Sequence, residues 1–85
     1  MKYYIVHTIC DDGGGKIESD IILVATSQEK AKEKFADLVE HEKLFLETEE
    51  RNWCVLEESD TVFVVGDGAY CAAFTEIKIS EYTEE

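Results

Sequence analysis

The chain has 85 residues, of which 45% are hydrophobic and 11% aromatic, and it contains no proline. This length allows one domain, and the composition excludes a disordered chain because it supplies enough apolar side chains for a packed core. Twenty acidic residues oppose eight basic ones, so the formal net charge is −12, which excludes nucleic acid and anionic membrane surfaces as direct partners.

Two segments at the start of the chain, residues 3–10 (YYIVHTIC) and 17–25 (IESDIILVA), are rich in β-branched and aromatic residues and predict strands. Between them, residues 11–16 (DDGGGK) combine aspartates with three glycines, which predicts the turn of an antiparallel hairpin. The glycines and Lys16 also suggest a phosphate-binding loop. That loop would require Ser or Thr in place of Ile17, and a helix rather than a strand after it. We therefore expect a hairpin.

An amphipathic helix is predicted next. Thr26 and Glu29 have the spacing of a capping box at its start. The side chains that would face the sheet follow the helical period and are Ala31, Phe35, Leu38 and Val39, continued by Phe45 and Leu46 if the helix extends so far. Glu42 would project into this apolar stripe. Because burying an unpaired carboxylate is costly, we expect the helix to bend or end near residues 41–42, the alternative being a carboxylate at the rim of the core.

The rest of the chain returns to the period of two that is typical of strands. Strands are predicted at residues 53–56, 61–65 and 71–82, giving the order β-β-α-β-β-β. This order predicts one α+β domain over residues 1–85, in which one amphipathic helix covers a mainly antiparallel sheet in two layers. Because the first strand is apolar on both faces, the face away from the helix needs a cover, which a homodimer or a protein partner would supply.

The cysteines and histidines do not form a pattern typical of catalytic or metal sites. Cys10, Cys54 and Cys71 are odd in number and widely spaced, which predicts reduced thiols in the core of a cytoplasmic protein and no zinc site. His7 and Cys10 are three positions apart on one strand, so they would face opposite sides of the sheet. We expect no enzymatic activity, no cofactor and no metal. With no leader and no long apolar run, we also expect neither export nor membrane insertion.

The excess of carboxylates is then the strongest functional signal, and it predicts a basic protein as the partner. We expect the carboxylates to take the place of nucleic-acid phosphates on a nuclease or another nucleic-acid-binding protein. The candidate contacts are one side of the helix, the acids of turns and loops, and one tyrosine next to a tight turn. They are Glu29, Glu33, Asp37, Glu40, Asp11, Asp12, Glu57, Glu58, Asp60, Asp67 and Tyr70.

In its size, its acidity and its compact arrangement of strands with one helix, the chain resembles the small phage-encoded inhibitors of bacterial defence systems, the anti-CRISPR proteins. The resemblance covers the whole chain and implies a nuclease target with a basic DNA or guide-RNA channel. Because these inhibitors share no sequence motif, it assigns no individual residue. Two other hypotheses stay open. One is a small-molecule or nucleotide-binding module, either monomeric or dimeric, with a cleft lined by Trp53, Phe63, Tyr70 and Phe74. The other is a non-catalytic acidic accessory protein.

Overall fold

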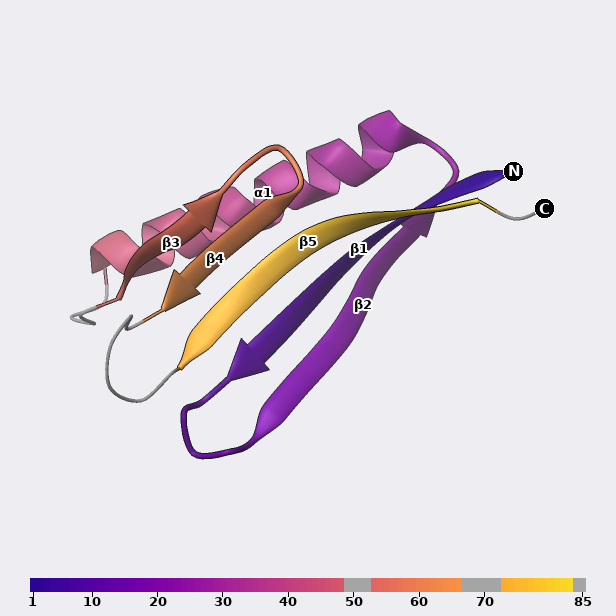
Figure 1. The fold of residues 1–85 in the computed structure, drawn as a ribbon. Helices are drawn as coiled ribbons and strands as arrows, with labels where there is room; N and C mark the ends of the chain where they lie inside the picture. The colour runs from indigo at the N-terminus through magenta and orange to yellow at the C-terminus, as the bar shows by residue number, and fades with distance from the viewer. Residues whose placement is uncertain (49–52, 67–72, 84–85) are drawn as a thin grey trace.

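The computed structural model describes residues 1–48, 53–66 and 73–83, and its elements follow the predicted order (Figure 1). They are β1 (Lys2–Asp11), β2 (Ile17–Ala25), α1 (Gln28–Thr48), β3 (Cys54–Glu58), β4 (Val62–Gly66) and β5 (Phe74–Thr83). The strands form one sheet in the order β2-β1-β5-β4-β3, and each pair of neighbours is antiparallel. The predicted α+β class is confirmed.

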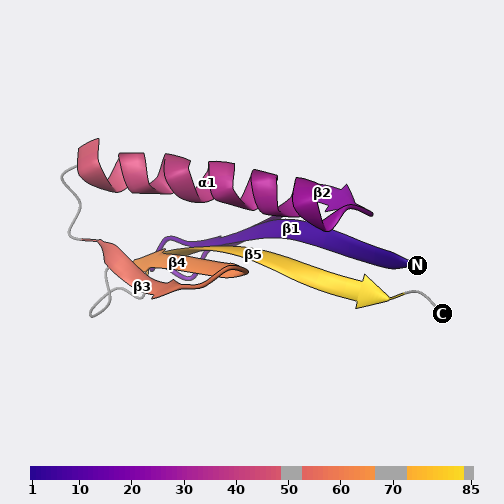
Figure 2. The ribbon, with the colours of Figure 1, turned by 90° about the horizontal axis from the view of Figure 1, so that it is seen from above.

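The last strand of the chain joins the two halves of the sheet. β5 lies between β1 and β4, so it connects the β1–β2 hairpin with the β3–β4 hairpin. α1 lies across one face of this sheet as a second layer (Figure 2) and packs mainly over β1, β2 and β5. We call this side the covered face. The opposite side, on which no described helix or strand lies, is called the open face.

The hydrophobic core fills the space between α1 and the covered face. Its buried members are Val6, Ala31, Phe35, Phe63, Val65 and Ile77. Partly buried side chains that surround them are Tyr4, Leu23, Leu38, Val39, Leu46, Trp53 and Ile79. The sheet residues among them occupy alternate positions of their strands, as one face of a pleated sheet requires. The predicted apolar stripe of the helix is therefore confirmed for its first four residues and for Leu46.

The helix differs from the prediction at both ends. Its cap is Ser27, one residue later than predicted, because the Ser27 Oγ accepts a hydrogen bond from the backbone N–H of Lys30 at 3.3 Å. The helix then continues without a break to Thr48, so the predicted end near residues 41–42 is wrong. Glu42 is half-buried, at the rim of the core, where its carboxylate keeps contact with water. Phe45 is 38% exposed instead of joining the core.

The cysteines also differ from the prediction. Cys10 and Cys54 are free thiols but are exposed, so the expectation that they lie in the core is wrong for both, while Cys71 lies outside the described residues. Cys10 is on the covered side but near the end of β1, where its Sγ accepts a hydrogen bond from the Thr75 Oγ1 at 3.7 Å. At the other end of the same two strands, Lys2 and Glu81 form an ion pair of 3.0 Å. The hydrogen bond to Glu81 and its negative charge raise the pKa of Lys2.

Candidate functional site

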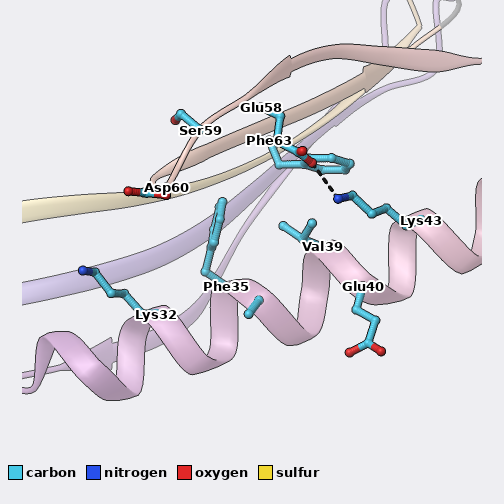
Figure 3. Close-up of a pocket in the computed structure, with 10 residues that line it drawn as sticks. Lys32, Phe35, Val39, Glu40, Lys43, Glu58, Ser59, Asp60 and Phe63 are labelled. Atoms are coloured by element: carbon cyan, nitrogen blue, oxygen red, sulfur yellow. Dashed lines mark ion pairs between the residues drawn. The ribbon is translucent and has the colours of Figure 1, made fainter.

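Four carboxylates form a row along the outer surface of α1, the side that faces away from the sheet. The acidic row consists of Glu29, Glu33, Asp37 and Glu40, which are all exposed. Their spacing of four, four and three residues places them on one side of a helix. At a rise of about 1.5 Å per residue, the row is about 16 Å long. Figure 3 shows its last member, Glu40, pointing away from the sheet, whereas Phe35 and Val39 point toward it.

The acidic row is not neutralised within the molecule. In the part of the chain that the structure describes, the ion pairs involve Glu18, Glu58 and Glu81, and none involves a carboxylate of the row. Like charges three or four residues apart destabilise a helix by about 0.2–0.5 kcal/mol per pair. With three such neighbouring pairs, repulsion within the row costs about 1 kcal/mol. Lysines three residues away from each member of the row, at positions 30, 32, 34 and 43, offset part of this cost.

An apolar side chain continues the acidic row. Leu44 follows Glu40 by four residues, so it lies on the same side of the helix, and it is 54% exposed. Protein interfaces combine such an apolar anchor with surrounding charges, which steer association. Leu44 was not among the predicted contact residues, because a helix that ends near residues 41–42 would not include it. Because the helix continues to Thr48, the spacing of four residues from Glu40 places Leu44 on the outer surface of α1.

A groove of about 820 Å³ lies between α1 and the β3–β4 hairpin, lined by Glu40 of the acidic row on one side and by Glu58 and Asp60 on the other (Figure 3). Phe35, Val39 and Phe63 contribute apolar side chains to the groove, and Lys43 crosses it. The Lys43 Nζ lies 2.8 Å from the Glu58 Oε2 and 5.7 Å from the centre of the Phe63 ring. Glu58 therefore already has a lysine as its ion-pair partner, unlike the carboxylates of the row.

The neighbours of Glu58 point in different directions. Glu57 pairs in register with Val64, whose side chain is on the open face, whereas Glu58 pairs with Phe63 on the covered face. Asp60 lines the groove from the turn itself, across from Lys32 (Figure 3). The turn acids therefore do not form one surface, and only part of them lies near α1.

Asp11 and Asp12 lie at the tip of the β1–β2 hairpin, away from α1 (Figure 1). The Asp11 Oδ1 accepts a hydrogen bond from the Gly13 N–H at 2.8 Å, and the Asp12 Oδ1 accepts one from the Gly14 N–H at 2.7 Å. Gly13 and Gly15 have φ angles of +82° and +92°, which glycine adopts without strain. The predicted hairpin turn is confirmed. Its aspartates also occupy the amides that a phosphate would need, which excludes the phosphate-binding loop.

The structure therefore divides the predicted contact residues into three places: the acidic row, the β3–β4 turn and the hairpin tip. Asp67 and Tyr70 lie outside the described residues. The aromatic residues proposed for a cleft are also separated. Phe63 lines the groove beside α1, while Trp53 and Phe74 line another cavity, of about 420 Å³, next to the hairpin tip.

Within the described residues, the histidine and the cysteine of β1 are not brought together. His7 and Cys10 face opposite sides of the sheet, as predicted, and the His7 Nε2 lies 3.1 Å from the Ser80 Oγ. The Ser59 hydroxyl in the groove accepts hydrogen bonds from the backbone N–H groups of Thr61 and Val62, so it stabilises the turn. Across the described ranges, no group of three or more His, Cys, Asp or Glu side chains is placed to hold a metal ion.

Comparison with known proteins provides no family for this chain. No protein-family model matches it, and neither a curated protein nor a solved structure shows a significant match. Over residues 1–48, 53–66 and 73–83, no helix has both the length and the apolar character needed to cross a membrane.

Proposed function

We propose that this protein is a non-catalytic binding protein whose acidic row contacts a basic, nucleic-acid-binding protein and takes the place of nucleic-acid phosphates. The main support is that the four carboxylates stand in one exposed line without an ion-pair partner among the described residues. A carboxylate that is already paired gains little from a new cation, whereas these four are available to the lysines and arginines of a partner. A nuclease is the partner class we expect, in line with the resemblance to phage-encoded inhibitors.

The spacing of the row indicates how much its charges, compared with an apolar contact, would contribute to the affinity for the partner. The row has about one carboxylate per 5 Å of helix axis, whereas a DNA strand carries one phosphate per about 3.4 Å. The row therefore has a lower charge density than the nucleic acid with which it would compete. Charge alone would mainly accelerate and orient the encounter, because exposed ion pairs contribute little to stability. Leu44 would supply the apolar contact that slows dissociation.

A competition assay tests this proposal directly. A fluorescent oligonucleotide is bound to each of a panel of purified basic nucleases, and the protein is added at low salt. The wild type is expected to displace the oligonucleotide from its target. The variant Glu33→Lys/Asp37→Lys reverses the centre of the row and is expected to displace it about tenfold less well, because two attractive contacts become repulsive. Leu44→Ala should weaken displacement without changing its salt dependence.

A matched control separates the row from overall charge. The variant Glu18→Lys/Asp20→Lys makes the same charge change on β2, where both residues are exposed, and is expected to compete like the wild type. Circular dichroism confirms that each variant is folded. Equal losses in both double variants would show that net charge acts without the row. A panel in which no nuclease releases its oligonucleotide at low salt would show that the proposed function is wrong.

A further inference from the structure

The open face of the sheet is largely apolar and is not covered by any described element. Strand alternation and register place large apolar side chains on this face, among them Ile5, Ile21, Val24, Val62, Val64 and Tyr82. Ile21, Val24 and Tyr82 are 68%, 56% and 55% exposed. These apolar side chains lie on both sides of the polar residues of β5, and exposed apolar side chains grouped in this way on a small domain mark an interaction site.

The charges at the centre of this face are balanced. β5 places Glu76 and Lys78 there, one acid and one base, while the acids Asp11 and Glu57 stand at its edges. In a molecule with a net charge of −12, the centre of the open face is thus without net charge. A partner selected by positive charge would find no carboxylate cluster here. A second copy of this chain would find a surface that is complementary to itself.

We infer that the protein forms a symmetric dimer in which the open faces of two sheets pack against each other. The two-fold axis lies between the two sheets and parallel to them, and it passes over Ile77 at a right angle to β5. It brings Glu76 of each copy opposite Lys78 of the other. Two equivalent ion pairs result, as a self-complementary interface requires. In the sheet, Val62 lies beside Lys78 and Val64 beside Glu76. The same axis therefore places Val62 of each copy opposite Val64 of the other.

The available area suits a weak, reversible dimer. Strands lie about 4.8 Å apart and advance about 3.3 Å per residue, so the three long and two short strands present about 600 Å² in projection. With the axis at Ile77, only residues whose register lies within three positions of Ile77 meet the other copy, about two thirds of this area, so two copies would bury about 800 Å², the size of a weak, reversible interface. The dimer would leave both acidic rows on its outer sides, so it would present two copies of the surface proposed to bind a basic protein.

Solution mass tests this inference without any partner protein. Light scattering across a concentration series, from micromolar to near-millimolar, is expected to show a dimer for the wild type. Lys78→Glu and Glu76→Lys each place like charges opposite each other twice and should weaken the dimer by about tenfold or more. The double variant Glu76→Lys/Lys78→Glu restores opposite charges and should recover the dimer. Lys30→Glu, on exposed α1, makes the same charge change as Lys78→Glu and should leave the dimer intact.

The two single variants provide independent tests, so the failure of one to fold leaves the other informative. A wild type that remains monomeric at all concentrations would overturn the inference, and the open face would then have another cover. A dimer that resists both single variants would also overturn it, because a different surface, such as the exposed edge of β2, would hold the copies together. Since the assay contains no nuclease, its outcome is separate from that of the displacement assay.

Discussion

The outer surface of α1 and the open face of the sheet both face solvent, but their chemistry is opposite. The helix presents four exposed carboxylates without an ion-pair partner among the described residues. The open face presents apolar side chains around one acid and one base, Glu76 and Lys78. A net charge of −12 is thus compatible with a face that is neutral at its centre. Composition gives the size of the charge, and only the helical period and the strand register give its position.

The largest expected effect tests whether the open face is truly uncovered. Val65 and Val64 are neighbours on β4, but Val65 is buried on the covered face and Val64 is half-buried on the open face. Val65→Ala is expected to lower the free energy of unfolding by about 2–3 kcal/mol, because it removes buried apolar volume and leaves a cavity. Val64→Ala should cost about 1 kcal/mol or less in the monomer. Urea unfolding at low protein concentration measures both.

The two variants share the same change in strand propensity, so their difference reports packing alone. Equal losses would show that the open face is packed as tightly as the covered face, and the comparison between the two surfaces would fail. A loss for Val64→Ala that grows with protein concentration would instead agree with the dimer, since the side chain is then buried between two copies.

Salt provides the next test, because the two surfaces should respond to it in opposite directions. The Debye length falls from about 10 Å at 0.1 M salt to about 3 Å at 1 M, so exposed charges are progressively screened. Binding of a basic nuclease through the acidic row should weaken by about tenfold over this range. The dimer should not weaken, because salt also screens the repulsion between two copies of charge −12.

The displacement assay and light scattering, performed on the same samples, measure the two responses. If both associations weaken with salt to the same extent, the open face is held by charge rather than by apolar contact, and the distinction between the surfaces is wrong. If nuclease binding is insensitive to salt, the carboxylates are not the contact.

Most of the fold could be predicted from local sequence patterns. The helical period predicted which side chains of α1 enter the core, and the glycines with two aspartates predicted the first hairpin. The strand order could not be predicted, because the insertion of β5 between β1 and β4 depends on contacts between distant parts of the chain. The end of the helix was wrong because Glu42 was treated as a buried charge, although a position at the rim leaves it in contact with water.

The candidate site was predictable only in part, because it too depends on contacts between distant parts of the chain. The acidic row follows from the helical period alone, so its position was evident in the sequence. Whether the loop acids join it depends on tertiary structure, which places Asp11 and Asp12 at a distant hairpin and pairs Glu58 with Lys43. Leu44 became visible only with the true length of the helix.

The smallest expected effect links the stability of α1 to its proposed function. Asp37→Lys replaces two repulsive contacts, with Glu33 and Glu40, by attractive ones and introduces a better helix former. It also loses the favourable contact with Lys34, so the net gain in the free energy of unfolding should be about 0.5 kcal/mol. The same variant should displace an oligonucleotide from the nuclease less well than the wild type.

Two controls isolate the cause of that gain. Asp37→Asn removes the charge without reversing it and should give about half of the gain, whereas Asp20→Lys, on exposed β2, should change stability by less than about 0.5 kcal/mol. Thermal unfolding in low salt, where these interactions are least screened, measures all three variants. A carboxylate that serves only to keep the surface hydrated could be replaced without loss of binding. If Asp37→Lys is more stable and still competes like the wild type, the acidic row is such a surface, and the partner contacts the protein elsewhere.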